Sequence, residues 1–380
     1  MPDAIPFNRP ALVGNELDYM RQAVESGHTS AKGSFTERVA GMLREEHGAA
    51  DVLLTTSCTD ALEMAALLLD LGPDDEVVVP SFTFVSTALA FARTGARLVF
   101  ADIEGETLGI DPASVAERVT QDTRVVVPVH YAGVGVDMDA LSAAMAASPR
   151  AEIVEDNAHG LFGAIGDRPL GTFGRLSALS FHETKNFVCG EGGALVVNDP
   201  DDVMRAHTIL DKGTNRRAFM LGEVDKYSWQ DIGSSFGLSD LNAAYLLAQL
   251  EAKEAVLAQR KRVFDRYMAA LEPYAAEDGF RVPVIPEDRT QGYHMFYVLL
   301  PDRDTRNRVL GELREQGINA TFHYVPLHSA PGAKRFTDRE YDCPVTDDIS
   351  GRLMRFPFYN DLSDGQIDRV VEAFLGAVGD

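Results

Sequence analysis

The sequence predicts an α/β protein whose larger part is a mostly parallel sheet covered by helices, followed by a smaller α+β part. Three observations lead to this fold class. The first two-thirds of the 380 residues alternate short Val/Ile/Leu-rich runs with helix-like segments. Several of these runs are continuously apolar, as expected of strands that are buried on both faces. From about Leu238 the alternation gives way to longer helical patterns.

Seven segments of the first part are expected to be strands. Strand and helix in alternation imply right-handed crossovers between parallel strands. The last segment is expected to pair antiparallel with its predecessor, because too few residues separate them for a crossover helix. The helical segment DALEMAALLLDLG is expected to end at Gly72. The strand segments are DVLLTTS from Asp51, EVVVPS from Glu76, RLVFADI from Arg97, RVVVPVH from Arg124, EIVEDN from Glu152, LSALSF from Leu176 and ALVVN from Ala194.

The C-terminal part is expected to be a smaller α+β domain. Leu238 to Met268 has the pattern of one long helix, and no Gly/Ser-rich or Pro-rich tether precedes it. A strand YHMFYVLLP from Tyr293, a helix RNRVLGELREQG and a strand INATFHYV follow. We therefore expect a large domain over residues 1–245 and a small domain over residues 246–380, joined by a helical linker.

Composition excludes several classes of function. The net charge of −23 would repel nucleic acids and anionic membranes, although local arginines and lysines can still hold a small anion. Cys58, Cys189 and Cys343 are odd in number and widely spaced, so neither a disulfide framework nor a metal site is expected. The start, MPDAIPFNRP, lacks the pattern of a signal peptide, and no uncharged run approaches membrane-spanning length. A soluble cytoplasmic protein is the expectation.

A lysine in an unusual setting is the first candidate for chemistry. In LSFHETKNFVCGEGGAL, residues 179–195, Lys185 directly follows a core-like strand and precedes a glycine-rich stretch. The carboxyl end of a central strand lies in the crevice where α/β sheets bind ligands. Burial and nearby cations there lower the pKa of a lysine, which frees its amine to attack a carbonyl and form a Schiff base. The alternative is a loop lysine without chemistry.

Two further residues favour a reactive lysine. The strand EIVEDN ends at Asp156, and His159 follows three residues later. A buried carboxylate needs a cationic partner, and the pyridinium nitrogen of pyridoxal phosphate is one. His159 is placed to bond the phenolic oxygen of that cofactor. Alternatively, Asp156 caps a turn and His159 is a core histidine.

A phosphate site is expected where TTSCTDALEM passes from a strand into a helix. Ser57 and Thr59 supply hydroxyl groups and the helix supplies free amides, although either residue would also serve as an ordinary N-cap. Ser180 adds a hydroxyl five residues before Lys185. Phe84, just past a strand, is a candidate to stack on a planar ring, or else a core aromatic.

Taken together, these motifs resemble the DegT/StrS family of sugar aminotransferases. The motifs SCTDALEM, PSFTFVST, VPVHYAG, VEDNAHG, SFHETKN and GEGGAL carry the resemblance, which extends from IPFNRP to FPFYNDLS. It implies the pyridoxal-phosphate-dependent aspartate-aminotransferase fold, called fold type I. HETKN, DKGTNR, VDKYSWQDIGSS and FHYVPLH resemble, more narrowly, the bacterial 4-aminotransferases that act on dTDP-4-keto-6-deoxy-D-glucose.

The resemblance implies roles for the candidate residues. Lys185 would hold the cofactor and shuttle the proton, Asp156 would keep the pyridine nitrogen protonated, and His159 would contact the phenolic oxygen. A related dehydratase branch has histidine in place of Lys185, so lysine favours transamination. The remaining cofactor contacts would be the ring-stacking Phe84 and the phosphate-binding residues Ser57, Cys58, Thr59 and Ser180.

The resemblance also implies substrates and partners. L-glutamate would be the amino donor, dTDP-4-keto-6-deoxy-D-glucose the acceptor, and the products 2-oxoglutarate and a dTDP-4-amino-4,6-dideoxyhexose. A homodimer is expected, with the active site at its interface. Candidate contacts for the sugar nucleotide, each of which is alternatively a solvated loop residue, are Asn8, Arg9, Lys212, Arg216, Lys226, His323, Tyr324 and His328.

One position departs from the family pattern. Many members have an asparagine three residues before the aspartate of a GLSDLNAA-like motif, and it reaches the partner subunit's cofactor phosphate. This chain has Gly237 there, before Asp240. Ser234, Ser235 and Asn215 are candidate substitutes.

Three other functions compete with this interpretation. GEGGAL superficially resembles a dinucleotide fingerprint, but such a fingerprint opens a helix, whereas this stretch precedes the strand-like ALVVN. A 3-keto sugar nucleotide aminotransferase of the same family is the nearest alternative. A non-catalytic regulator that binds pyridoxal phosphate is the other, and the intact Lys185, Asp156 and His159 argue against it.

Overall fold

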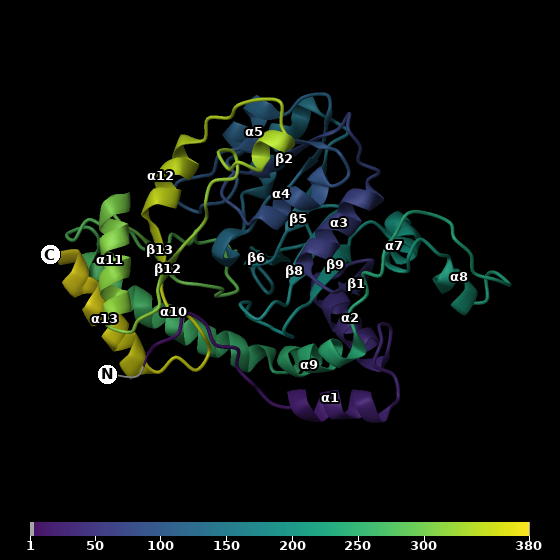
Figure 1. Cartoon of the computed structure of the whole chain (residues 1–380), viewed down its shortest axis with the longest axis horizontal. Helices are drawn as coiled ribbons and strands as arrows, with labels where there is room; N and C mark the ends of the chain where they lie inside the picture. Colours follow the sequence, from purple (N-terminus) through teal and green to yellow (C-terminus); the bar gives the residue numbers. More distant parts are fainter. Residues whose placement is uncertain (1–3, 380) are drawn as a thin grey trace.

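The fold is built around one large central sheet. The computed structural model describes residues 4–379, and within them the largest sheet has seven strands in the order β1-β9-β8-β5-β4-β2-β3 (Figure 1). Only β9 runs antiparallel to its two neighbours, and the other pairings are parallel. The strands are β1 (Asp51–Thr55), β2 (Glu76–Pro80), β3 (Arg97–Ala101), β4 (Thr123–Val126), β5 (Glu152–Asp156), β8 (Leu176–Ser180) and β9 (Gly193–Val197).

Each of the seven expected strands is present in this sheet, and the expected antiparallel pairing of ALVVN with its predecessor is confirmed. Most residues of these strands are buried, because helices cover both faces of the sheet. Alternate side chains enter different cores. Leu53 packs with α3, α4 and α7, whereas its neighbours Val52 and Leu54 pack with α2 and α9. A third cluster joins Val78 and Val99 to α5 and α6.

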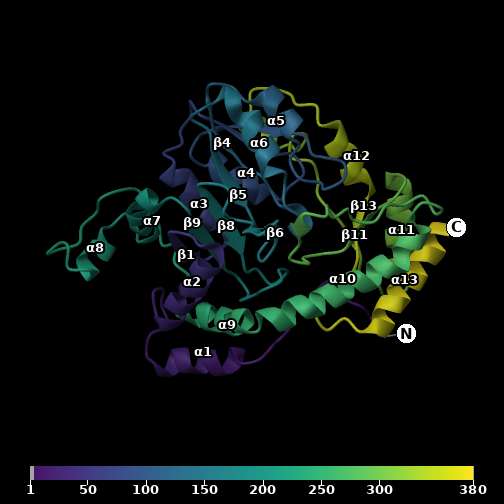
Figure 2. The ribbon, with the colours of Figure 1, turned by 180° about the vertical axis from the view of Figure 1, so that it is seen from behind.

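These helices surround the sheet in both views of the chain (Figures 1 and 2). They are α1 (Glu16–Glu25), α2 (Ser34–His47), α3 (Cys58–Leu68), α4 (Val85–Ala92), α5 (Pro112–Arg118), α6 (Met138–Ala144), α7 (Val203–Leu210) and α9 (Asp240–Glu251), whereas α8 (Arg216–Met220) lies on a segment that projects away from the sheet. A small sheet with strand order β10-β6-β7 lies beside them, formed by β6 (Ala164–Ile165), β7 (Arg168–Pro169) and β10 (Arg289–Thr290). Within residues 4–379, no helix has the length and apolar character needed to cross a bilayer.

The C-terminal residues form a second hydrophobic core. It contains side chains from residues 263–377 together with Ile5, which the N-terminal segment brings alongside Ile318. Its helices flank an antiparallel sheet with strand order β11-β13-β12. The elements are α10 (Lys253–Ala275), β11 (Tyr297–Leu299), α11 (Arg303–Glu315), β12 (Thr321–Phe322), α12 (Pro344–Arg352), β13 (Leu353–Arg355) and α13 (Asp364–Gly379). The two C-terminal strands expected from the sequence are present but shorter than expected.

The long helix expected from Leu238 to Met268 is two helices. Ala252 departs from helical geometry, with φ −94° and ψ 18°, and separates α9 from α10. The break lets α9 pack on α1 and α2 while α10 packs on α13 (Figure 2). The expected domain boundary between residues 245 and 246 stays a prediction. Leu246, Leu250 and Val256 share one core with the large sheet.

The expected helix end at Gly72 was also wrong. α3 ends at Leu68, and Asp70, not a glycine, adopts the left-handed conformation with φ 50°. Aspartate tolerates this region better than most residues. Its carboxylate also accepts a hydrogen bond from Arg205 Nη1 at 2.7 Å. Arg205 Nη1 also donates to the Leu68 carbonyl at 2.9 Å, so a residue distant in sequence satisfies the last turn of the helix.

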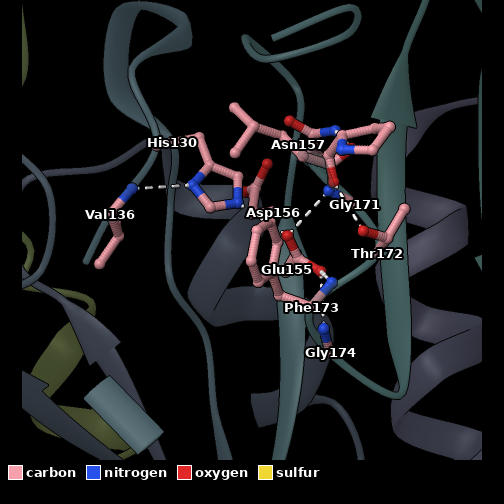
Figure 3. Close-up of polar contacts among 12 residues, drawn as sticks. His130, Val136, Glu155, Asp156, Asn157, Gly171, Thr172, Phe173 and Gly174 are labelled. Carbon is pink, nitrogen blue, oxygen red and sulfur yellow. Dashed lines mark hydrogen bonds and ion pairs between the residues drawn. The ribbon is translucent and has the colours of Figure 1, made fainter. Parts of the chain in front are cut away.

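The fully buried carboxylate of Glu155 fixes the position of the end of β5 through hydrogen bonds. Glu155 accepts hydrogen bonds from the backbone N–H groups of Gly171, Phe173 and Gly174 at 2.7–2.8 Å (Figure 3). His130 Nε2 lies 2.9 Å from the same carboxylate. Because His130 Nδ1 accepts from the Val136 N–H at 3.2 Å, Nε2 carries the proton and donates to Glu155. This network ties β5 to the loops on either side of it.

We expect Glu155→Gln to destabilise the fold by about 3–5 kcal/mol, because the new amide group would face N–H donors. Chemical denaturation of the apoprotein measures the change. Glu152→Gln is the matched control: this residue of the same strand forms a half-exposed ion pair with Arg175, and its loss should cost less than about 1 kcal/mol. Equal stability of Glu155→Gln and wild type would contradict this role.

Candidate active site

The candidate site lies at one edge of the central sheet. β5 and β8 are adjacent and parallel, so their last residues, Asp156 and Ser180, emerge at the same edge. β1 ends there at Thr55, and the antiparallel β9 begins there at Gly193. Lys185 follows β8 in a turn closed by its N–H, which donates to the His182 carbonyl at 2.9 Å. Residues far apart in the sequence therefore meet at these strand ends.

A cavity of about 500 Å³ opens at this edge and is lined by both the sheet part and the C-terminal part of the chain. Every residue expected to bind the cofactor or to act in catalysis lines it, together with three of the substrate candidates. These are Ser57, Cys58, Thr59, Phe84, Asp156, His159, Ser180, Lys185, Asn8, His323 and Tyr324. Their convergence supports the expected roles, which stay predictions.

Lys185 is electrostatically prepared to act as an amine. Burial lowers its pKa to about 8, with a further lowering from Arg355, while Cys58 and Asp156 act in the opposite direction. Its Nζ atom forms no hydrogen bond or ion pair within the described part of the chain. The amine is therefore free to react, and about a tenth of it is uncharged at pH 7, far more than for an ordinary lysine.

Asp156 is held so that its carboxylate borders the cavity. Its Oδ2 accepts from the Thr87 hydroxyl at 2.7 Å, and its Oδ1 accepts from the Ala158 N–H at 3.1 Å. The adjacent Glu155 points into the network of Figure 3 instead, because successive side chains of a strand face opposite ways. No arginine or lysine side chain among residues 4–379 forms an ion pair with Asp156. A cationic ligand is thus the partner that this buried acid lacks.

His159 is a neutral histidine with an unused nitrogen. Burial lowers its pKa well below the usual value, and the charges of Lys185, His323 and Arg355 lower it further. Its Nδ1 is buried and has no hydrogen-bond partner within residues 4–379. Such an orphaned atom at a cavity wall indicates that a ligand supplies the missing partner.

The ring of His159 is positioned by a residue that the sequence did not reveal. His294 stacks on it, with ring centroids 4.2 Å apart and an interplanar angle of 21°. His294 Nδ1 in turn lies 3.0 Å from Asn186 Oδ1. Since Asn186 directly follows Lys185, this chain of contacts links the lysine turn to His159. The YHMFY segment appeared only as a strand, and no local signal pointed to this role.

The start of α3, residues 57–59, is the predicted phosphate site, an anion cup that stays a prediction. Ser57 is the N-cap of the helix and its hydroxyl accepts from the Asp60 N–H at 3.1 Å. Capping occupies the Asp60 N–H, whereas the Cys58 and Thr59 N–H groups before it have no intrahelical partner. The Thr59 hydroxyl lies 2.8 Å from Ser86 Oγ. Capping by Ser57 is therefore compatible with the predicted binding of an anion at this helix start.

The glycine-rich stretch after Lys185 has a steric cause. A Cβ atom on Gly193 would lie 2.4 Å from the Cys58 nitrogen and 2.5 Å from the Ser57 carbonyl oxygen. Only a residue without a side chain lets β9 approach the first turn of α3 this closely. Gly193 of GEGGAL is thus required for the packing of β9 against the first turn of α3. This steric role agrees with the exclusion of a dinucleotide fingerprint.

Five substrate candidates lie outside this cavity. Arg9 forms an exposed ion pair with Asp361 at 3.3 Å, and His328 Nδ1 lies 2.7 Å from the Ser81 hydroxyl. Lys212 and Arg216 line a separate hollow beside Gly237, and Lys226 is exposed between α8 and α9. Their expected contacts with a sugar nucleotide stay predictions.

Two of the candidate substitutes for the missing asparagine can be compared. Asn215 is engaged locally, because its Oδ1 accepts from the Ser228 N–H at 2.7 Å. Ser235 lines the hollow that contains Gly237. The Ser235 side chain is therefore better placed than that of Asn215 to replace the missing asparagine in a phosphate contact at this hollow.

Arg355 was missed altogether by the sequence interpretation. It lines the main cavity from β13. Nothing in the local pattern LMRFPF distinguishes it from an ordinary surface arginine, because its surroundings come from residues distant in the sequence.

The fold and the cavity define an α/β enzyme of the aspartate-aminotransferase type. Residues 10–375 match the DegT/DnrJ/EryC1/StrS aminotransferase family. The chain belongs to this family, which confirms the predicted family, fold class and enzyme class.

Relatives and solved structures agree with this assignment. The spore coat polysaccharide biosynthesis protein SpsC of Bacillus subtilis is 30% identical over 377 residues, covering 97% of this chain and 96% of that protein. The aminotransferase TlmJ from Streptoalloteichus hindustanus has a TM-score of 0.91 and 28% identity, with 99% of each chain covered. The PLP-form of Spr1654 from Streptococcus pneumoniae has a TM-score of 0.90 and 24% identity, also with 99% of each chain covered, and shows the shared fold.

We expect the Lys185 amine of the apoprotein to react with an acylating reagent half-maximally at about pH 8, because the reactive free base appears as pH rises through its lowered pKa. Peptide mapping by mass spectrometry across a pH series measures this midpoint, with Lys226 as an internal reference. In Asp156→Asn the midpoint should fall, since the carboxylate raises the lysine pKa. A wild-type midpoint near the ordinary lysine value of about 10.4 would contradict the analysis.

Proposed function

We propose that this aminotransferase moves an amino group from L-glutamate to carbon 4 of dTDP-4-keto-6-deoxy-D-glucose, with pyridoxal 5′-phosphate as cofactor. The products are 2-oxoglutarate and a dTDP-4-amino-4,6-dideoxyhexose. The convergence of Lys185, Asp156 and His159 beside an anion cup carries the proposal. The choice of sugar rests on the motifs HETKN, DKGTNR and FHYVPLH. The relative SpsC, a polysaccharide biosynthesis protein, is consistent with a sugar substrate.

Pyridoxal 5′-phosphate is supported by family membership and by how its chemical groups match the cavity. The amides and hydroxyls at the start of α3 suit a phosphate. Asp156 has no cationic partner among residues 4–379 and suits a protonated pyridine nitrogen. The unpartnered Nδ1 of His159 suits the phenolic oxygen. Phe84, which is 59% exposed, offers a ring face for stacking.

The chain's own residues orient the cofactor and move one proton. When bound, pyridoxal phosphate supplies an aldehyde that exchanges amines and a ring that delocalises the electron pair left by a broken Cα–H bond. The Lys185 amine is the base that takes this proton, and in the reverse direction its ammonium returns a proton to the sugar carbon. A positioned base of this kind contributes about 10²–10⁴-fold to the rate.

Asp156 and His159 hold charge in place during this transfer. The carboxylate of Asp156 stabilises a proton on the pyridine nitrogen, which keeps the ring electron-poor. His159 stays neutral, because burial and the nearby cations lower its pKa, and its nitrogens serve as hydrogen-bonding groups. The stack with His294 fixes its orientation.

The sugar is expected on the side of the cavity lined by the C-terminal part. His323 stacks on Tyr324, with ring centroids 3.4 Å apart, and His323 Nδ1 lies 3.1 Å from the Tyr131 hydroxyl. Burial lowers the pKa of His323 and raises that of Tyr324, so these two side chains are neutral. Neutral hydrogen-bonding groups suit the hydroxyl groups of a sugar, and aromatic faces suit its C–H groups.

A homodimer would complete the site. The segment that carries α8 projects from the body of the subunit (Figures 1 and 2), and it exposes Met220 by 72% and Trp229 by 83%. Large apolar side chains exposed together are typical of an interface. In a dimer, Arg216 and Lys226 of this projecting segment are candidates to reach the nucleotide diphosphate of the neighbouring site. The predicted cytoplasmic location rests on the motif and cysteine patterns and stays a prediction.

Replacing Lys185 by alanine tests the catalytic proposal. We expect Lys185→Ala to lose both the visible absorbance of the covalently held cofactor and amino transfer, by at least about 10²-fold. Enzyme, glutamate and the keto sugar nucleotide are incubated together, and NMR of the product locates the new amine on the sugar. Lys253→Ala is the matched control, since Lys253 binds Glu46 on the surface. Full transfer by Lys185→Ala, or a product aminated at carbon 3, would refute the proposed function.

The dimer is tested by polar substitution of the projecting segment. We expect the double variant Met220→Ser/Trp229→Ser to sediment as a monomer at concentrations where the wild type is a dimer, because the interface loses its apolar contacts. Tyr274→Ser is the control, as Tyr274 is an exposed aromatic residue on α10. A monomeric wild type, or a double variant that dimerises as tightly as wild type, would contradict this interface.

A further inference from the structure

Two buried threonines form a hydrogen-bonded chain that ends on Asp156. Thr87 lies in the first turn of α4, and its hydroxyl donates to Asp156 Oδ2 at 2.7 Å. Thr83 lies four residues earlier, and its hydroxyl oxygen is 2.8 Å from that of Thr87. The exposed fractions are 2% for Thr83, 1% for Thr87 and 5% for Asp156. All three residues belong to the cavity wall.

The hydroxyl of Thr87 departs from the usual behaviour of a serine or threonine in a helix. Such a hydroxyl commonly donates to the backbone carbonyl four residues earlier, as the Ser142 hydroxyl of α6 does to the Met138 carbonyl at 2.8 Å. Thr87 instead donates to a carboxylate that lies 69 residues later in the sequence. Its hydrogen bond therefore serves the cavity and not the helix.

The direction of this chain depends on the protonation of Asp156. When Asp156 is ionised, its carboxylate only accepts hydrogen bonds, so Thr87 gives its one hydroxyl proton to Asp156. Thr87 then accepts from the Thr83 hydroxyl, and both bonds point toward the carboxylate. Consecutive hydrogen bonds polarise one another, and bonds donated to a charged group favour its charged form. The chain therefore favours the ionised form of Asp156.

The two oxygens of Asp156 keep room for a ligand. Oδ2 accepts from Thr87, and Oδ1 accepts from the Ala158 N–H at 3.1 Å. These two bonds fix the plane of the carboxyl group, while each oxygen retains a further lone pair. Among the side chains of residues 4–379, only that of Thr87 donates to Asp156. Thr87 is therefore the side chain that sets how Asp156 meets its ligand.

We propose that Thr87 is a positioning residue that acts through Asp156 to keep a proton on the pyridine nitrogen of pyridoxal phosphate. The inference rests on the proposed function, in which Asp156 pairs with that nitrogen. A proton shared between a carboxylate and a pyridine nitrogen moves toward the nitrogen when other donors stabilise the carboxylate. A protonated ring withdraws electrons more strongly, as the breaking of the donor's Cα–H bond requires.

The protonation of the ring nitrogen can be measured without a substrate. Holoenzymes are prepared with pyridoxal phosphate that carries nitrogen-15 in its ring, and NMR records the resonance of this nitrogen. We expect the wild-type resonance in the range of a protonated pyridine and that of Thr87→Val displaced toward the neutral range. Valine keeps the branched shape of threonine and removes the donor. Thr87→Ser retains the hydroxyl and should keep the wild-type resonance.

The first half-reaction provides a second measurement. Stopped-flow absorbance with L-glutamate and no keto sugar gives the rate constant at saturation and the dissociation constant of glutamate separately. We expect Thr87→Val to lower the rate constant about tenfold, as the loss of one hydrogen bond to a charged group implies, with the dissociation constant changed by less than about twofold. Thr83→Val should act in the same direction more weakly, because Thr83 reaches Asp156 only through Thr87.

Thr346→Val is the matched control. Thr346 is also buried, and its hydroxyl donates to the buried Asp102 at 2.8 Å, outside the cavity. This variant should lose stability in chemical denaturation and keep the wild-type resonance and rate constant. The same displacement of the resonance in Thr346→Val would overturn the proposal. An unchanged resonance in Thr87→Val, or equal effects of Thr87→Ser and Thr87→Val, would overturn it as well.

Thr83→Val keeps the test decisive if Thr87→Val does not fold or does not bind the cofactor. In that case a wild-type resonance in folded Thr83→Val would refute the role of the chain. Failure of the proposed function has a different signature, because the wild type would then lack the visible absorbance of covalently held cofactor, or Lys185→Ala would keep it. A wild type with this absorbance and a Thr87→Val variant identical to it refute only the role of Thr87.

Discussion

The burial of two adjacent carboxylates at the end of β5 is the constraint on which the site depends. Glu155 is satisfied inside the protein, by His130 and by the backbone of the loop from Gly171 to Gly174. With Glu155 anchored, the alternation of a strand turns Asp156 the opposite way, toward the cavity. The buried Asp156 carboxyl group has no ion-pair partner among the described residues. The fold thus supplies hydrogen-bond partners to the Glu155 carboxylate and leaves the Asp156 carboxylate able to bind a ligand.

The rest of the site is assembled around this strand end from both parts of the chain. The parallel course of β1, β5 and β8 brings the anion cup, Asp156 and Lys185 to one edge of the sheet. The C-terminal sheet then closes the cavity with His323, Tyr324 and Arg355. Because the reacting groups come from opposite walls, orientation of the substrates depends on how these two parts pack together.

Electrostatics inside the cavity differ from those of the whole molecule. The chain has a net charge of −23, yet Lys185 and Arg355 are cations in the cavity without ion-pair partners among residues 4–379. The histidines around them are kept neutral by burial, which lowers the pKa of His159, His294 and His323. A cavity of this kind attracts small carboxylates and phosphates while the outer surface repels large polyanions.

The sequence by itself determined the sheet and the residues at its strand ends. Continuous Val/Ile/Leu runs are stable only when buried on both faces, so all seven strands were predictable, and the positions of Lys185 and Asp156 followed from where those strands stop. Tertiary structure alone decided how the last turn of α3 is satisfied, because Arg205, which donates to the Leu68 carbonyl, lies 137 residues away, and that α9 and α10 separate at Ala252. It also decided the surroundings of His294 and Arg355. Their neighbours come from distant segments, and no local pattern records whether a buried polar group finds a partner there.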